Sequence, residues 1–220
     1  ELWHYESVHG STCGTAVDLD GDGKQEVIAG TEYYWWHAIT PVGKSRWGYS
    51  TKTGPHANAV AAGDLNGDGK PEVVFGGADG NLHVLTNTGK LLWQFNTGDE
   101  VTAVAVRDLN GDGKGEVIAT SMSFNLYVLD GTGKTLWRRD RSDVLRDLVL
   151  IGGGSRPLIA AAGEDGRVAI YHPDGTLASE TRCEGPAIRL VTGDLDGRGK
   201  SELLVLNQNR GITALGSPKQ

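Results

Sequence analysis

The chain of 220 residues has little of several features that mark large classes of protein. It has no apolar run of about 20 residues, which is the length that a membrane-spanning helix requires. No stripe of lysine and arginine is present, and the net charge is −7. A nucleic-acid partner is therefore not expected, because nothing would neutralise its phosphates. Only two cysteines occur, and Cys13 and Cys183 leave open one disulfide or, as the favoured interpretation, two separate buried thiols.

A sustained 3.6-residue period of apolar positions is also missing, which excludes a helical solenoid. The chain contains instead 33 glycines, a number typical of a β protein that is dense in turns. Its 38% hydrophobic content is enough for one core, so residues 1–220 are predicted to form a single domain. No secretory signal is visible, but the chain begins at Glu1 without Met, and a leader removed by processing would explain that start.

One acidic phrase of nine residues occurs three times. It reads DLDGDGKQE from Asp18, DLNGDGKPE from Asp64 and DLNGDGKGE from Asp108. Calcium takes six to eight oxygen ligands, and alternate residues of a tight loop can direct such oxygens at one point. Three copies with the same order of acids predict about three structural calcium ions. The expected ligands are the side chains or, for lysine, the backbone carbonyls of Asp18, Asp20, Asp22, Lys24, Glu26, Asp64, Asn66, Asp68, Lys70, Glu72, Asp108, Asn110, Asp112, Lys114 and Glu116.

These loops differ from an EF-hand. An EF-hand needs a glutamate at position 12 and flanking helices. Here the last acid is at position 9, and strand-forming pairs such as Val73-Val74 follow it. The alternative interpretation, a solvated turn without a metal, would suit one copy better than three. A fourth copy, DLDGRGKSE, keeps Asp194, Asp196 and Glu202 but has Arg198 in place of an acid, so an empty or weak site is expected there.

The spacing of the phrase predicts the architecture. The second and third copies begin 46 and 44 residues after the copies before them, and the fourth begins 86 residues after the third. A hidden unit must therefore lie between the last two, and Leu158-Ile159-Ala160 aligns there with Val117-Ile118-Ala119. Val149 and Ile151 fall where its ligands should be, so its ion site is lost.

Each unit contains four short strands. In the second unit we expect them at about 58–65, 72–77, 82–86 and 91–96. Four strands in each 40–45 residues, repeated, predict an all-β, five-bladed β-propeller of four-stranded antiparallel blades. The repeat units are expected at about 11–50, 57–96, 101–139, 144–182 and 187–215, with residues 1–6 completing the last one.

The two ends of the chain are complementary. ELWHYE at residues 1–6 resembles the fourth strand KLLWQF at residues 90–95, whereas the C-terminus stops just after a third strand. The N-terminal strand is therefore predicted to complete the last blade and close the ring, which would remove exposed sheet edges. A fragment of a longer propeller is the alternative. Trp3, Trp47, Trp93 and Trp137 recur at the fourth-strand position, which indicates packing between blades.

The acidic phrases resemble the FG-GAP/VCBS repeats of integrin α-subunit propellers and of many secreted propellers. The resemblance covers essentially the whole chain and implies calcium loops on a lower face and ligand binding on the upper face. It does not specify a function. The segment GNLHVLTNTGKLLWQF also resembles the third and fourth strands of quinoprotein-type repeats, which is only weak support for a quinone cofactor.

One turn departs from the repeat. Between the second and third strands, where other units have Gly, Asn and Asp, the first unit has Tyr33, Tyr34 and Trp35. Exposed aromatic rings suit the CH faces of sugars or a protein interface. A hydrophobic plug between blades is the alternative, and Trp36 is expected to pack there. Polar ligand-binding candidates on the same face are His9, His56 and Arg141.

The sequence thus favours a calcium-stabilised binding module, lectin-like, that recognises a glycan or a cell-surface protein. Calcium loops of this type suit extracellular calcium, so a secreted, periplasmic or cell-surface location is expected. No catalytic residue is assigned, and a non-enzymatic role is favoured. The alternatives are a polysaccharide lyase or glycoside hydrolase, a propeller module of one, or a scaffold used only in assembly.

Overall fold

The computed structural model describes residues 2–51, 56–152, 156–199, 201–209 and 211–216. Their regular structure consists of strands and turns, and no helix suited to crossing a membrane is found among them. The fold is all-β, as predicted. Four antiparallel sheets have four strands and the last has three, and each sheet is built from strands in sequence order.

The strand bounds follow the predicted units closely. The first sheet holds β1 (Ser11–Val17), β2 (Glu26–Thr31), β3 (Trp35–Ile39) and β4 (Ser45–Ser50). The second holds β5 (Ala57–Gly63), β6 (Glu72–Gly77), β7 (Asn81–Leu85) and β8 (Leu91–Asn96). The third holds β9 (Val101–Arg107), β10 (Glu116–Ser121), β11 (Asn125–Leu129) and β12 (Thr135–Asp140).

The hidden unit and the last unit complete the series. The fourth sheet holds β13 (Leu145–Ile151), β14 (Leu158–Gly163), β15 (Arg167–Tyr171) and β16 (Leu177–Arg182). The fifth holds β17 (Ala187–Gly193), β18 (Glu202–Asn207) and β19 (Ile212–Leu215). The fourth unit is therefore a full four-stranded sheet without an acidic loop. The alignment that put Val149 and Ile151 in the place of the acids was wrong, because both lie within β13, and the connection from β13 to β14 is shorter than the acidic loops.

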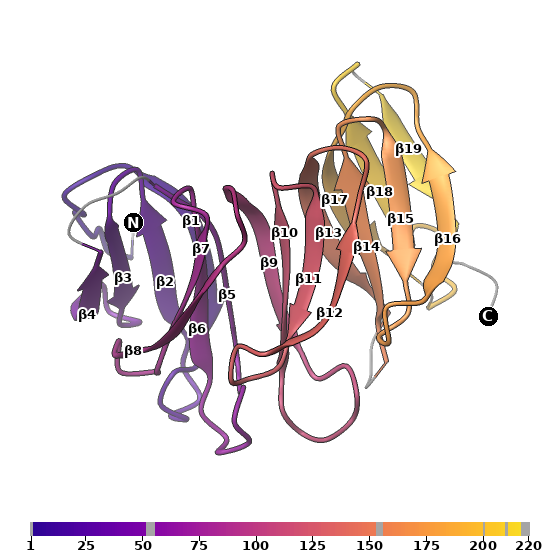
Figure 1. Ribbon diagram of the computed structural model, residues 1–220. Coiled ribbons are helices and arrows are strands. Elements are labelled where there is room, and N and C mark those ends of the chain that lie inside the picture. Colours follow the sequence, from indigo (N-terminus) through magenta and orange to yellow (C-terminus); the bar gives the residue numbers. More distant parts are fainter. Residues whose placement is uncertain (1, 52–55, 153–155, 200, 210, 217–220) are drawn as a thin grey trace.

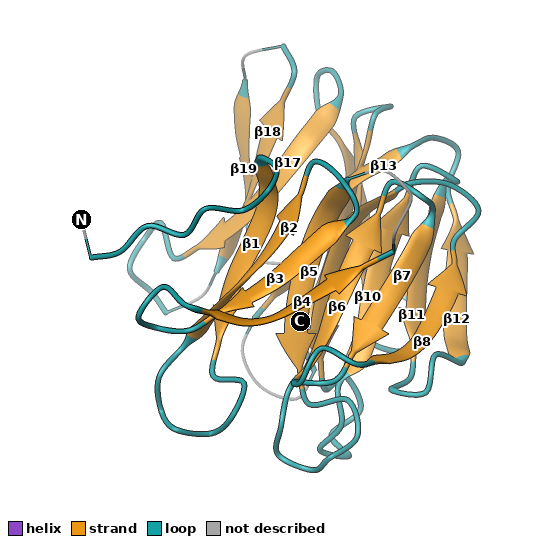
Figure 2. Ribbon diagram, turned by 90° about the vertical axis from the view of Figure 1, so that its left-hand side faces the viewer, coloured by secondary structure: helices purple, strands orange, loops and turns teal. Residues whose placement is uncertain are grey.

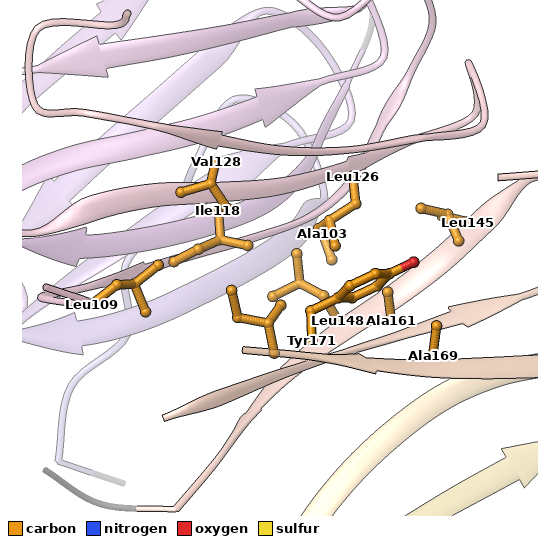
Figure 3. Close-up of a cluster of buried hydrophobic side chains, with 11 residues drawn as sticks. Ala103, Leu109, Ile118, Leu126, Val128, Leu145, Leu148, Ala161, Ala169 and Tyr171 are labelled. Carbon is orange, nitrogen blue, oxygen red and sulfur yellow. The ribbon is translucent and has the colours of Figure 1, made fainter. Parts of the chain in front are cut away.

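The core lies between the sheets. The two middle strands of the second, third and fourth sheets are buried on both faces. Four clusters of apolar side chains fill the four spaces between successive sheets. Figure 3 shows the cluster between the third and fourth sheets, where Tyr171 of β15 lies beside Leu148 and Ala161. In the cluster between the first two sheets, Trp36 is buried and stacks on Phe75 at 4.9 Å. Trp36 therefore packs between blades, as expected.

A repeated indole contact joins the first sheet to the second, the second to the third and the third to the fourth. Trp47 Nε1 donates to the Asn87 carbonyl at 2.9 Å, Trp93 Nε1 to the Gly131 carbonyl at 3.0 Å and Trp137 Nε1 to the Pro173 carbonyl at 2.8 Å. Each acceptor lies in the turn between the third and fourth strands of the following sheet. In that turn a glycine with positive φ lies against the indole. Gly89, for example, has a φ of 81°, and a Cβ at this position would stand 2.7 Å from the Trp47 ring, which is too close for a larger residue. We call this contact the indole joint.

The five sheets form an open arc in the structure. Figure 1 shows them in sequence order across the molecule, with the two chain ends on opposite sides. Ring closure by the N-terminal strand is not confirmed: Glu1 lies outside the described residues, and Leu2–Glu6 form no strand. The segment lies instead on the first sheet, where Trp3 Nε1 donates to the Pro41 carbonyl at 3.0 Å.

Candidate functional site

The second and third acidic loops have the same internal geometry. Asp64, directly after β5, accepts hydrogen bonds from the backbone N–H groups of Gly67 and Gly69, both at 2.7 Å. Gly67 has a φ of 83°, which permits the reversal of the chain. Glu72, at the start of β6, closes the loop by accepting from the Leu65 N–H at 2.9 Å. In the third loop Asp108 and Glu116 make the corresponding bonds.

In each of these two loops, carboxylates converge around the side-chain amide of one asparagine. Asn66 Nδ2 lies 3.0 Å from Glu72 Oε1 and 3.4 Å from Asp68 Oδ2. Asn110 Nδ2 holds Glu116 and Asp112 in the same way, at 2.9 and 3.4 Å. All three loops share one more contact. In each, the backbone N–H of the lysine donates at 2.8 Å to the side chain of the aspartate two residues earlier; these lysines are Lys24, Lys70 and Lys114.

The crowding of negative charge shifts the pKa values of the loop acids. Burial, and then the nearby Asp68 and Asp64, raise the pKa of Glu72, and burial with Asp112 and Asp108 raises that of Glu116. For Asp64, burial would raise the pKa, but its backbone N–H donors outweigh it and the pKa is lowered. A divalent cation would relieve this repulsion, and the donors present are the oxygens that calcium prefers.

The first loop differs from the second and third because an arginine side chain lies on it. The carboxylate oxygens of Asp18, Asp20 and Asp22 lie within 4.8 Å of one another. Arg46 of β4 reaches over them, with Nη1 2.7 Å from Asp20 Oδ2 and 3.8 Å from Glu26 Oε1. This contact lowers the pKa of Asp20. The corresponding residues of β8 and β12 are Leu92 and Leu136, so no arginine side chain reaches the second and third loops from this position.

The fourth loop keeps its acidic cluster. Carboxylate oxygens of Asp194, Asp196 and Glu202 lie within 4.8 Å of one another, as in the first loop. Arg198, whose position holds an acid in the first three loops, has an exposed side chain with Nε 3.4 Å from Asp196 Oδ2, and its backbone N–H donates to Asp194 and Asp196. The expected weakness of this site remains a prediction.

The aromatic turn lies at the opposite end of the sheets. Tyr33, at the tip between β2 and β3, has 52% of its surface exposed. The His9 ring lies edge-on to it at 4.6 Å and to Tyr34 at 6.0 Å, and Glu32 N–H donates to the Gly10 carbonyl at 2.8 Å. The structure therefore brings together three predicted ligand-binding residues, His9, Tyr33 and Tyr34. We call these three the aromatic turn.

The rings of Trp35 and His56 take no part in the ring contacts of the aromatic turn, although the Trp35 N–H donates to the Tyr33 carbonyl at 2.5 Å. Trp35 is the first residue of β3, is half-buried, and stacks on His37 at 5.9 Å. His56 is exposed, and its carbonyl accepts the Ala78 N–H at 3.0 Å. No ring contact between His56 and the aromatic turn is present in the described part of the chain.

Comparisons with known proteins agree with this geometry. The model of the FG-GAP-like repeat matches residues 18–75 and 64–119, which include the first three acidic loops. The chain carries FG-GAP-like repeats. A second model, that of the λ-carrageenase β-propeller domain, matches residues 98–184, which span the third and fourth sheets. No curated protein sequence matches the chain.

Solved structures show that the FG-GAP-like units form a β-propeller fold. The chain is similar to BBS1N in its crystal complex with ARL6DN, with a TM-score of 0.76, 16% identity, and coverage of 99% of this chain and 70% of that one. It is also similar to the computationally designed Ika8 protein, with a TM-score of 0.72, 17% identity, and coverage of 93% and 57%. The units thus superpose on part of longer propellers.

Arg141 joins the third and fourth sheets. Its Nη1 donates to Tyr171 Oη at 3.0 Å, and its Nη2 forms a short ion pair with Glu180. Because these partners belong to the fourth sheet, the guanidinium bridges the third and fourth sheets, and its side chain is mostly buried. A ligand would have to compete with both contacts.

Sequence reasoning missed a cavity of about 570 Å³ between the third and fourth units. It lies beside the third acidic loop, and its polar lining includes Asn110, Glu116, Arg156, His172 and Asp174. No sequence motif marked this cavity, because its lining comes from separate segments of two units.

Sequence reasoning also missed His37. In the second sheet the equivalent His83 contacts Asp79 of its own turn, with Nε2 3.0 Å from Oδ2. The aromatic turn has no such acid, so His37 Nε2 is buried without a hydrogen-bond partner, and burial lowers the pKa of His37. Tyr5 Oη is 3.2 Å from His37 Nδ1 on the other side of the ring.

Proposed function

We propose that this chain is a calcium-stabilised, non-catalytic β-propeller module that binds a glycan through its upper face. The aromatic turn is the observation that carries the proposal. A hairpin tip normally holds Gly, Asn or Asp, so the exposed ring of Tyr33 beside His9 has no turn-forming reason. An exposed ring supplies the flat apolar surface that a sugar ring stacks on, and the imidazole supplies a hydrogen-bonding group.

The location follows from the calcium chemistry. Loops with few charged ligands and much exposed surface suit the millimolar calcium outside cells. We therefore place the module in a secreted, periplasmic or cell-surface setting. A cell-surface protein is the other partner that an exposed aromatic cluster suits, and the similarity to a carrageenase propeller domain favours the glycan.

The glycan proposal is tested by an array of glycans probed with the parent and with Tyr33→Ala and Tyr34→Ala variants. Binding by the parent and its loss in both variants is the expected result. Phe124→Ala is the matched control, because Phe124 is an exposed aromatic residue at the equivalent turn of the third sheet. Equal binding by all variants would contradict the assignment of the aromatic turn, and no binding by the parent would favour the protein partner or a scaffold.

The calcium proposal is tested by thermal unfolding with calcium, with magnesium and with EDTA. At a calcium concentration 10–100 times the dissociation constant, each site adds about 1.4–2.7 kcal/mol to the free energy of unfolding. For a chain of this size we expect a rise of about 3–10 °C per site. An Asp64→Asn, Asp108→Asn double variant should lose most of the rise. An identical melting temperature in calcium and in EDTA would refute the proposal.

A second candidate function is a module of a polysaccharide-cleaving enzyme. The cavity between the third and fourth sheets favours it, because all the residues that line it lie within residues 98–184, the part similar to the λ-carrageenase propeller domain. Release of reducing ends from λ-carrageenan, and its loss in His172→Ala and Asp174→Asn variants, would support this candidate. Thr132→Ala, at the equivalent turn of the third sheet, is the control. Absence of release leaves the binding module as the function.

A further inference from the structure

The second and third acidic loops are joined by a backbone hydrogen bond. The Gly115 N–H donates to the Asp64 carbonyl at 2.7 Å. Asp64 is the first expected calcium ligand of the second loop, and Gly115 stands between Lys114 and Glu116, two expected ligands of the third loop. Figure 1 and Figure 2 both show the acidic loops of the first three sheets at the same end of the molecule. The bond therefore connects the ligands of one predicted ion to those of the next.

The two loops also pack closely around this bond. A Cβ at Gly115 would stand 3.1 Å from the Asp64 carbonyl oxygen and 2.8 Å from the Val106 side chain, so glycine permits this approach without a shift. The aliphatic part of Lys114 lies against the turn of the second loop, since a Cβ at Gly67 would stand 3.5 Å from its Cγ and Cε. The second and third loops are therefore in contact at two points.

The first and second loops, both within the described part of the chain, lack this link. Residues 64–72 and 108–116 differ at one position only, where the second loop has Pro71 and the third has Gly115. Proline has no N–H, so the second loop cannot donate the equivalent bond to the first. A Cβ at Gly21, in the turn of the first loop, would meet no atom of the described residues within 4 Å. The same chain thus contains one linked and one unlinked pair of loops.

The link allows one loop to hold the other in place. The acids of each loop repel one another, and this repulsion is relieved when a cation binds. The backbone of that loop is then held in one conformation. Once the backbone is fixed at Asp64 or at Gly115, the residue across the hydrogen bond has less conformational freedom left to lose. The second binding event is therefore more favourable than the first.

We infer that the second and third loops bind calcium with positive cooperativity, and that the Gly115 N–H and the Asp64 carbonyl couple them. This cooperativity rests on the calcium proposal and adds how two of its sites act on each other. A backbone hydrogen bond of ordinary strength makes each site bind roughly two- to tenfold more tightly when the other is filled. The first loop binds independently of the second, because Pro71 interrupts the series of links.

Repulsion between two bound cations acts in the opposite direction. Salt weakens this repulsion, because the screening length falls from about 10 Å at 0.1 M to about 3 Å at 1 M. The hydrogen bond is not screened in this way. The cooperativity should therefore be at least as strong at about 1 M salt as at about 0.1 M. Cooperativity that disappears as salt is added would show an electrostatic origin and overturn the assignment to the hydrogen bond.

The coupling is measured by calorimetric calcium titration of three proteins. All three carry Asp22→Ala, which disables the first loop and leaves the second and third. One of them also carries Asp112→Ala, so that only the second loop binds, and another carries Asp68→Ala, so that only the third loop binds. The product of the two binding constants of the two-site protein should exceed the product of the two single-site constants roughly two- to tenfold. Equal products would overturn the inference.

A Gly115→Pro variant tests whether the hydrogen bond carries the coupling. It gives the third loop the sequence that the second loop already has, so the loop should still fold and bind calcium. Gly115→Ala is the matched control, because it adds the same Cβ and keeps the N–H. The proline variant should lose the coupling, and the alanine variant should keep it. Coupling that survives in the proline variant, or that is lost equally in both, would overturn the assignment.

The calcium proposal and the cooperativity fail in different ways. If neither single-site protein binds calcium, the calcium proposal is refuted and the cooperativity with it. If both bind calcium and the products of binding constants are equal, the calcium proposal stands and only the cooperativity is refuted. Circular dichroism of each variant, with and without calcium, confirms that the chain is folded before the constants are compared.

Discussion

Arg46 separates the first acidic loop from the other loops of the same sequence pattern. Its guanidinium lies 2.7 Å from Asp20, in a blade where Glu26 is also within 3.8 Å. A bound calcium ion would meet this positive charge at close range. The arginine therefore acts as an internal competitor for the first site only, since leucines hold its position in the second and third blades.

Arg46→Leu should tighten calcium binding at the first loop. Two unit charges about 4 Å apart repel by about 1 kcal/mol in water, and calcium carries two charges, so the gain in affinity should be roughly 10- to 30-fold. Isothermal titration of the parent and the variant measures it. Lys24→Leu is the control, because Lys24 lies on the same loop but its Nζ is exposed and 3.5 Å from Asp22. An equal gain in the control would show that net charge alone sets the affinity.

Asp79 and His83 form a polar pair inside the second blade. Burial would raise the pKa of Asp79, but its hydrogen bonds from His83 and Asn81 outweigh burial and lower it. The carboxylate therefore stabilises the fold above its unfolded pKa, and this stability is lost as the pH falls through the lower folded pKa.

Asp79→Asn should lower the free energy of unfolding by about 1–3 kcal/mol at pH 7, because His83 loses a charged partner in a buried site. As the pH falls through the folded pKa of Asp79, the parent and the variant should converge, since the carboxylate becomes protonated. Urea unfolding at pH 7 and at low pH measures the difference. Asp140→Asn, at an exposed pair with Arg138, should change stability by less than about 0.5 kcal/mol. A difference that persists unchanged at low pH would contradict the ionic origin.

At the scale of the element, the indole joint connects the fourth strand of one sheet to a turn of the next sheet. The bond from Trp93 Nε1 to the Gly131 carbonyl links the second blade to a turn of the third. Trp93→Phe keeps most of the apolar surface and removes the bond, so it should cost about 1 kcal/mol. Trp93→Ala should cost about 3 kcal/mol, because the ring contact is also lost. Chemical denaturation measures both, and a Trp93→Phe variant as stable as the parent would show that the hydrogen bond contributes nothing.

The strands were predictable from the sequence because spacing and alternation are local. The expected strand at 82–86 is β7, displaced by one residue, and the spacing alone located the fourth blade. The aromatic turn was predictable because Tyr33 violates a local turn preference. Arg46 over Asp20 and Arg141 with Glu180 were not predictable, since 26 and 39 residues separate the partners. Only the packed sheets bring such pairs together.

For the whole molecule, position in the arc sets local stability. The third blade has a neighbour on each side, whereas the fifth has one and lacks a fourth strand. In an arrangement where each unit contacts only its neighbours, opening starts at an unsupported end. Amide hydrogen exchange should therefore be slowest in β10 and β11 and fastest in β18 and β19. Uniform protection of all five blades would show that the arc unfolds as one unit.

The indole joint has a further consequence for how such a chain can change its length. Trp47, Trp93 and Trp137 each reach forward to a carbonyl in the next unit, so the same pair of groups recurs at the first three junctions. A tandem duplication that copied one complete unit would therefore keep each indole matched to an acceptor at both new junctions. A duplication of half a unit would leave an indole without its acceptor. Growth in whole units is the route that this chemistry permits.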